Sequence, residues 1–254
     1  MELMIDVGNT NTVLGLYKSG QLKNTWRLGS KNSRTEDECW LAVNSLFILH
    51  KYDPQKISGV AISSVVPEIT LLYQRMVKKY LDLDPLLITT ELDLGMEILY
   101  QDPGAVGADR LCNAVAGKAK YGAPLIILDF GTATTFDCLD KNGDYLGGVI
   151  CPGIESAAAI LHFKAAKLPK IDLVFPAKVI GQTTEESMQS GILFGIVELI
   201  DGLVIKIKSE LGSGAKVIAT GGMAPLISDR TKSIDWVEEE LIIEGIYLIY
   251  NRNR

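Results

Sequence analysis

Residues 4–17 read MIDVGNTNTVLGLY, and residues 127–140 read ILDFGTATTFDCLD. Each stretch has the pattern of an apolar strand that runs into Asp-x-Gly, then a turn of small polar residues, then a second apolar strand. The aspartates are Asp6 and Asp129, so the second copy begins close to the middle of the 254-residue chain. This placement indicates a chain made of two related halves.

The segments that follow the first stretch predict a regular α/β unit. A third strand is expected around residues 22–28, and the capping-box pattern Thr35-x-x-Glu38 then opens an amphipathic helix. An apolar strand, a second amphipathic helix and a further strand come next. The predicted order is therefore β-β-β-α-β-α-β.

The second half repeats this order. Three strands are followed by a second capping box at Thr183 and a long helical region over 184–211, then by a strand and a final helix. We predict an α/β protein with two β-β-β-α-β-α-β halves, 1–117 and 118–254, and a cleft between them.

The composition argues against several classes of function. A net charge of −6 without a basic block does not favour nucleic-acid binding. The N-terminus lacks the pattern of a secretory signal, and charged residues interrupt the most apolar segment, 191–207, so a buried helix is expected there. The four cysteines show no C-x-x-C spacing and the two histidines lie far apart. We expect reduced thiols, no zinc site and a cytoplasmic protein away from membranes.

The paired Asp-x-Gly turns predict a phosphate-binding site. Glycine and small hydroxyl residues expose backbone N–H groups to a polyanion, whereas a carboxylate beside phosphate requires a cation between them. One such turn is usually only a tight hairpin, but two copies in register favour a nucleotide bound with Mg²⁺. The chain contains neither the P-loop pattern nor G-x-G-x-x-G, so a different nucleotide-binding fold is needed.

The chain resembles the type III pantothenate kinases, within the acetate and sugar kinase/Hsp70/actin superfamily. That resemblance implies a duplicated ribonuclease-H-like (actin-like ATPase) fold. It covers nearly the whole chain through ordered motifs, which are DVGNTNTVLG (6–15), ISSVVP (62–67), VGADR (106–110), DFGTATTFD (129–137), GGVICPGI (147–154), AAKLP (165–169), IGQTTEESMQSGI (180–192) and VIATGGMAPLI (217–227).

The resemblance implies ATP-dependent phosphorylation of the primary hydroxyl of pantothenate, the first step towards coenzyme A. Asp109 corresponds to the proposed catalytic base, although its position at a helix start also fits a simple helix cap. A carboxylate there is expected to be kept ionised by the free N–H groups. Arg110 fits either a ligand-binding role or a structural ion pair. The family's pantothenate contacts correspond to Tyr100, Gly107, Ala108, Asp109, Arg110 and Thr184.

Two of these positions have simpler interpretations when taken alone, since an isolated tyrosine usually packs in a core or on a surface and Thr184 fits a helix cap. The resemblance also implies that Thr132 contacts the nucleotide and that Asp129 binds a monovalent cation, K⁺ or NH₄⁺. Gly221 and Gly222 fit either a close approach to adenosine or a plain strand-to-helix turn. The first ATP loop corresponds to Asp6, Val7, Gly8, Asn9, Thr10, Asn11, Thr12 and Val13.

The resemblance further implies a homodimer. Gly191 and Gly195 fit a close helix crossing, but they fit internal packing or a helix break equally well. Two other functions compete with the kinase. One is a different small-molecule kinase of the same superfamily, which would have no reason to keep VGADR or IGQTTEES. The other is a non-catalytic regulatory accessory factor. Such a protein would be expected to lose its active-site carboxylates, whereas Asp6, Asp109 and Asp129 are all present.

Overall fold

The computed structural model describes residues 1–30 and 35–254 of the chain. Within these residues the chain forms two compact units. The first consists of Met1–Ala116 together with Leu241–Arg254, and the second is Gly117–Glu240. The C-terminal segment, expected in the second half, therefore lies in the first unit. The reason is its helix α7 (Leu241–Arg252), which packs on the first sheet.

The first unit is built on a five-stranded sheet with the order β3-β2-β1-β4-β5. Its central strand β1 pairs antiparallel with β2 and parallel with β4. The strands are β1 Glu2–Val7, β2 Asn11–Lys18, β3 Gln21–Gly29, β4 Gly59–Ser64 and β5 Leu86–Leu87. The other elements are α1 Glu36–Leu49, η1 Pro54–Lys56, α2 Pro67–Leu81, η2 Pro103–Ala105 and α3 Ala108–Tyr121, whose last turn belongs to the second unit, besides α7.

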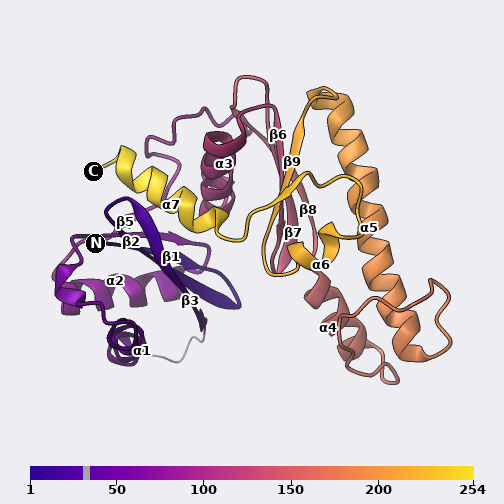
Figure 1. The fold of residues 1–254 in the computed structure, drawn as a ribbon, viewed down its shortest axis with the longest axis horizontal. Helices are drawn as coiled ribbons and strands as arrows, with labels where there is room; N and C mark the ends of the chain where they lie inside the picture. The colour runs from indigo at the N-terminus through magenta and orange to yellow at the C-terminus, as the bar shows by residue number, and fades with distance from the viewer. Residues whose placement is uncertain (31–34) are drawn as a thin grey trace. The chain divides into compact units, whose positions relative to one another are not determined.

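Helices cover both faces of this sheet (Figure 1). The β1 side chains Leu3, Ile5 and Val7 are buried in a cluster with α1 and α2. On the opposite face, a Cβ at Gly15 would overlap Ile243 of α7, so the glycine lets this helix lie directly on the sheet. Because strand side chains alternate between the faces, Asp6 points to the face that α7 covers.

The second unit repeats this architecture with the strand order β10-β9-β6-β7-β8. Its central strand β6 again pairs antiparallel with the next strand, β7, and parallel with a later one, β9. The strands are β6 Leu125–Phe130, β7 Ala133–Leu139, β8 Tyr145–Pro152, β9 Lys216–Thr220 and β10 Trp236–Val237. The helices are α4 Ile154–Lys164, α5 Thr184–Leu211 and α6 Ala224–Ser228.

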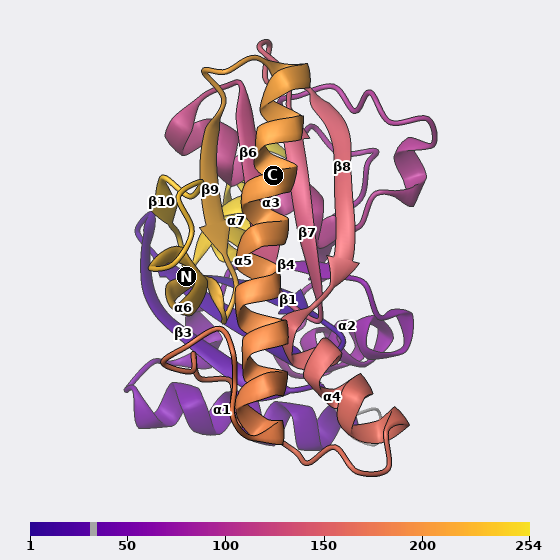
Figure 2. The same ribbon diagram turned by 90° about the vertical axis from the view of Figure 1, so that its right-hand side faces the viewer.

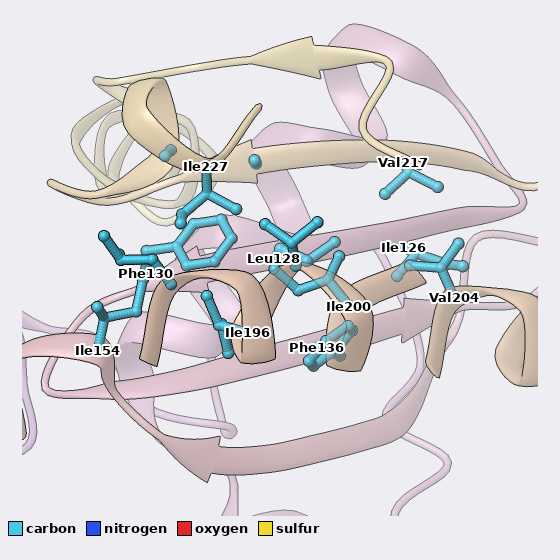
Figure 3. Close-up of a cluster of buried hydrophobic side chains, with 14 of the residues drawn as sticks. Ile126, Leu128, Phe130, Phe136, Ile154, Ile196, Ile200, Val204, Val217 and Ile227 are labelled. Atoms are coloured by element: carbon cyan, nitrogen blue, oxygen red, sulfur yellow. The ribbon is translucent and has the colours of Figure 1, made fainter. Parts of the chain in front are cut away.

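One face of the second sheet is covered by α5, which lies along the strands with α4 beside its N-terminal part (Figure 2). Ile126, Leu128 and Phe130 of β6 point into the cluster beneath α5, where they meet Ile196 and other side chains (Figure 3). By the same alternation, Asp129 points to the opposite face. The two motif aspartates thus hold equivalent places in the two units.

Local sequence signals explain the helix starts. Thr35 forms the predicted capping box, since its hydroxyl accepts the Glu38 N–H at 3.2 Å while the Glu38 carboxylate accepts the Thr35 N–H at 2.8 Å. Thr183 caps α5 by accepting the Glu186 N–H at 3.1 Å. The Glu186 carboxylate, however, binds the N–H of Gln182 rather than that of Thr183.

One helix of the second unit was absent from the predicted order, and one of the alternatives left open for the α5 glycines is excluded. The helix α4 was not predicted, because its sequence, IESAAAILHFK, has no clear polar face from which a helical period could be read. The glycines of α5 do not break that helix, which runs continuously from Thr184 to Leu211. No helix in the described part of the chain is both long and apolar enough to cross a membrane.

Candidate active site

The first Asp-x-Gly turn joins β1 to β2 and presents polar residues to solvent. Asn9, Thr10 and Asn11 are exposed, and the Gly8 N–H closes the turn on the Asn11 carbonyl at 3.0 Å. The Thr12 side chain is buried and its hydroxyl lies 2.8 Å from that of Ser30. The sequence-predicted loop is therefore a tight hairpin tip with its hydroxyl and amide groups at the surface. Val7 is buried and Val13 half-buried, so these two shape the strands rather than the tip.

Asp6 is the penultimate residue of β1 and is half-buried. Ser63 lies opposite Asp6 in the parallel pairing of β1 with β4. Its hydroxyl donates to Asp6 Oδ1 at 3.0 Å. The neighbouring strand thus orients the carboxylate.

Asp109 lies in the first turn of α3. Its Oδ1 accepts the Arg110 N–H at 2.8 Å, and a Cβ at Gly107 would lie 2.5 Å from that oxygen. Burial raises the pKa of the Asp109 carboxyl, and this outweighs the opposing effects of the Arg110 N–H and the Arg110 charge. The expectation that helix N–H groups keep this carboxylate ionised therefore identifies only the smaller influence. Arg110 itself is buried, as is Ala108.

The buried thiol of Cys112 lies near both Asp6 and Asp109. Cys112 of α3 is fully buried, and burial raises the pKa of its thiol well above the usual value. The negative charges of Asp6 and of Asp109 raise that pKa further, while a hydrogen bond with Ser63 opposes them. Asp6 and Asp109, which are far apart in the sequence, therefore act on one atom of the structure. No sequence pattern predicted this proximity.

Tyr100 lies in the loop that precedes α3 and is 38% exposed, so it is not a core residue. The same loop is tied to the C-terminal segment upstream of Tyr100. The Asn253 side chain accepts the Asp93 N–H at 3.0 Å and donates to the Asp93 carbonyl, also at 3.0 Å. The loop carrying Tyr100 is thus anchored by residues from the opposite end of the chain.

The second Asp-x-Gly turn joins β6 to β7 and packs against the start of α4. Thr132 is exposed, and its carbonyl accepts the Ser156 hydroxyl at 2.7 Å. Gly153 precedes α4, and a Cβ there would overlap the carbonyl oxygens of Gly131 and Thr132. The turn therefore rests directly on the N-terminus of an 11-residue helix, where free N–H groups favour negative charge.

Asp129 stands at the end of β6 between two threonines. Thr135 faces it on β7 and Thr220 faces it on β9. Gly221 has φ of +91°, and a Cβ there would lie 2.7 Å from Asp129 Oδ1. Position 221 therefore requires glycine for two structural reasons, its positive φ and its close approach to the Asp129 carboxylate.

Thr184 is the first residue of α5 and is exposed, but the cap hydroxyl belongs to Thr183. Taking Thr184 for the helix cap is therefore wrong by one residue. Thr184 lines a groove of about 480 Å³ between α4 and α5. The rest of this groove is mainly apolar and includes Gly191 and Gly195, whose positions have nothing within 4 Å of an added Cβ.

Within the residues that the structure describes, neither aspartate turn supplies a full set of protein side-chain ligands for a metal ion. Among residues 1–30 and 35–254, no three His, Cys, Asp or Glu side chains gather where they could hold a metal ion. A cation held by Asp6 or by Asp129 would take its other ligands from hydroxyl, carbonyl or phosphate oxygens, which hard cations prefer.

Solved structures place the fold in a known class. A protein of Campylobacter jejuni assigned to the Baf family of transcriptional activators superposes with a TM-score of 0.61 at 19% identity, covering 98% of this chain and 97% of its own. Component A of the (R)-2-hydroxyglutaryl-CoA dehydratase of Acidaminococcus fermentans superposes with a TM-score of 0.55 at 12% identity, covering 98% and 95%. At these identities the likeness concerns the fold alone. The predicted class, a duplicated actin-like ATPase fold, is confirmed.

The sequence comparisons are more specific. A family profile described as type III pantothenate kinase matches residues 2–206. A type III pantothenate kinase of Anaeromyxobacter sp. (strain Fw109-5) is 44% identical over 254 residues, which is 100% of both chains. This chain belongs to the type III pantothenate kinase family.

Proposed function

We propose that this protein phosphorylates the primary hydroxyl of pantothenate with ATP, giving 4'-phosphopantothenate, the first step of coenzyme A biosynthesis. The full-length match at 44% identity to a type III pantothenate kinase carries this proposal. Members of the actin-like fold class act on many acceptors, so the fold by itself would leave the acceptor open. The Baf-family likeness, at 19% identity, gives no support to a regulatory function.

Asp109 is the proposed base. Phosphoryl transfer passes through a loose transition state, so catalysis depends on positioning the acceptor hydroxyl and on taking up its proton as the bond forms. A carboxylate whose pKa is raised by burial is a better proton acceptor than an ordinary aspartate, provided that it is ionised at the working pH. The hydrogen bond from the Arg110 N–H fixes its orientation.

Tyr100, Gly107, Ala108, Arg110 and Thr184 are the proposed pantothenate contacts. A side chain at position 107 would meet the Asp109 carboxylate, so this position beside the proposed base requires glycine. The exposed ring of Tyr100 and the exposed position of Thr184 on its groove leave both near solvent, where a substrate can reach them.

ATP binds with a divalent cation in this family of kinases, and Asp6 is the proposed carboxylate for Mg²⁺. Its oxygens suit a hard cation, and Ser63 holds the group in place. Mg²⁺ supplies charge neutralisation for the phosphates. The tip residues Gly8 to Thr12 and Thr132 of the second turn are the proposed phosphate contacts. Asn9, Thr10, Asn11 and Thr132 are exposed at the two hairpins, whereas the buried Thr12 hydroxyl lies beside that of Ser30.

The adenosine has a candidate pocket in the second unit. A cavity of about 910 Å³ is lined by apolar side chains of α4 and by Met223 and Leu226, directly after the Gly221–Gly222 turn. An apolar cavity with a few charged residues at its edge fits a purine base.

A monovalent cation, K⁺ or NH₄⁺, is proposed at Asp129. Neither phosphate turn contains a lysine or arginine, so a fixed cation would offset phosphate charge there. The flanking Thr135 and Thr220 offer further oxygens. Asp129→Asn should abolish the difference in turnover between K⁺ and Na⁺ buffers, and a variant that kept this difference would exclude the assignment.

A homodimer is proposed through α5. A Cβ added at Gly191 or Gly195 would meet nothing within 4 Å, which leaves room for a close helix crossing. On the same helix Leu199 is 37% and Ile205 is 69% exposed, and an apolar face of this kind is typical of an obligate interface. We also propose a cytoplasmic enzyme, because all four cysteines are free thiols.

The reaction itself is tested by its product. Protein incubated with ATP, Mg²⁺ and pantothenate should yield phosphopantothenate by liquid chromatography and mass spectrometry. A pantothenate analogue without the primary hydroxyl should remain unmodified. Phosphorylation of the analogue, or no product from pantothenate, would refute the proposed acceptor.

A further inference from the structure

The first serine of the motif ISSVVP lies beside Asp6, the carboxylate proposed for Mg²⁺. Ser63 is on β4, where it is fully buried and directly opposite Asp6 in the sheet. Ser64 points away from Asp6. Its hydroxyl accepts the Val66 N–H at 3.1 Å and the Thr70 hydroxyl at 2.6 Å, at the start of α2. The two neighbouring serines therefore serve different faces of the strand.

The Ser63 hydroxyl connects Asp6 to the interior of the first unit. It donates to Asp6 Oδ1 at 3.0 Å and also contacts the thiol of Cys112. A hydroxyl has a single proton, and here Ser63 donates it in the hydrogen bond to Asp6 Oδ1. The hydrogen bond to Oδ1 favours one orientation of the Asp6 carboxylate.

We propose that Ser63 is a positioning residue for phosphoryl transfer, because it orients the Asp6 carboxylate towards Mg·ATP. This inference rests on the proposed role of Asp6. Hydrogen bonds to a charged group are among the stronger ones in proteins, and a carboxylate held in advance binds a cation without losing side-chain freedom on binding. Ser63 therefore contributes to binding of the metal–nucleotide complex and has no direct part in binding pantothenate.

A purely structural role for Ser63 predicts something different. If the hydroxyl only satisfied a buried position between two strands, its removal would lower the melting temperature and leave the metal dependence of the enzyme unchanged. Ser64 offers a matched control, since Ser64→Ala removes the same group from the next residue without touching Asp6. Ser63→Thr keeps the hydroxyl and serves as the rescue variant.

The test uses the full chain as wild type, Ser63→Ala, Ser63→Thr and Ser64→Ala. ATP affinity is measured by isothermal titration calorimetry with Mg²⁺ and with EDTA, together with the Mg²⁺ concentration for half-maximal turnover and the melting temperature. In Ser63→Ala, we expect ATP affinity with Mg²⁺ to fall about 10-fold or more, and half-saturation to move to higher Mg²⁺. Affinity in EDTA and the KM for pantothenate should change less than twofold.

Ser63→Thr should recover the Mg²⁺ dependence, and Ser64→Ala should keep it. The inference is overturned if Ser63→Ala and Ser64→Ala behave alike towards Mg·ATP, or if a folded Ser63→Thr fails to recover. Failure of the proposed function looks different, because then the wild type itself would show no pantothenate-dependent turnover while still binding Mg·ATP.

Discussion

Gly153 offers a sharp test of the second phosphate turn. Its backbone has φ of −68° and ψ of 157°, which alanine adopts without strain, so Gly153→Ala adds only a methyl group. That methyl would lie 2.7 Å from the Thr132 carbonyl carbon and would overlap the carbonyl oxygens of Gly131 and Thr132. Ordinary contacts begin at 3.4 Å, and the two carbonyl oxygens lie closer to the methyl than the carbon does, so the turn and the start of α4 must separate by more than about 0.7 Å.

The expected losses of stability and of activity in Gly153→Ala follow from this displacement. Forcing a methyl group into a packed contact costs about 1–3 kcal/mol of stability, and a misplacement of about 1 Å in a catalytic site costs on the order of 100-fold in rate. We expect Gly153→Ala to lower kcat/KM for ATP by about 10- to 100-fold. The melting temperature should fall by several degrees, while the protein remains folded by circular dichroism.

The control is Gly214→Ala, in the same unit, where an added Cβ meets nothing within 4 Å. Steady-state kinetics with varied ATP at saturating pantothenate, and thermal denaturation, should show this control within twofold of wild type. If Gly153→Ala kept wild-type kcat/KM, the close packing of the turn on α4 would have no part in nucleotide binding, and our account of this turn would be wrong.

Three further predictions concern other parts of the molecule. The raised pKa of Asp109 means that its stabilising contribution is full below the unfolded value near 3.8 and is lost as pH rises through the folded value. Asp109→Asn should therefore raise the melting temperature relative to wild type more at pH 7 than at pH 4, and an equal difference at both would contradict the burial argument. Thr183→Ala should cost about 1 kcal/mol of stability by removing the α5 cap, whereas Thr184→Ala should leave stability unchanged and raise the KM for pantothenate. The reverse pattern in denaturation and kinetics would overturn our assignment of the two threonines. Gly195→Arg should halve the mass found by light scattering of a homodimer, and an unchanged mass would exclude this face of α5 as the interface.

The repeated Asp-x-Gly turns made much of the fold predictable. Each turn joins two antiparallel strands in the structure, as the strand-turn-strand pattern predicted, and the order of the first unit follows from strand and helix periods that are short-range properties of the chain. The capping signals at Thr35 and Thr183 likewise act within a few residues. Such local signals can be read from a sequence without knowing what packs against them.

Other features depend on contacts between distant segments. The packing of α7 on the first sheet requires Gly15, because a side chain there would overlap Ile243. From the sequence alone, Gly15 is only a glycine within a strand. The meeting of Asp6 with Asp109 around Cys112 requires β1 and α3 to be placed together. Tertiary packing decided each of these cases.

Pantothenate phosphorylation with Asp109 as the base is tested most directly by ADP release. The assay contains ATP, Mg²⁺ and K⁺, with and without pantothenate, and compares wild type with Asp109→Asn and Asp102→Asn. Asp102 lies in the loop that precedes α3 and caps the short η2 turn by accepting the Gly104 N–H. We expect pantothenate-dependent ADP release that falls by at least about 100-fold in Asp109→Asn and persists in Asp102→Asn. If wild type released no ADP in response to pantothenate, the assigned reaction would be wrong. If Asp109→Asn kept the wild-type rate, the reaction would stand without Asp109 as its base.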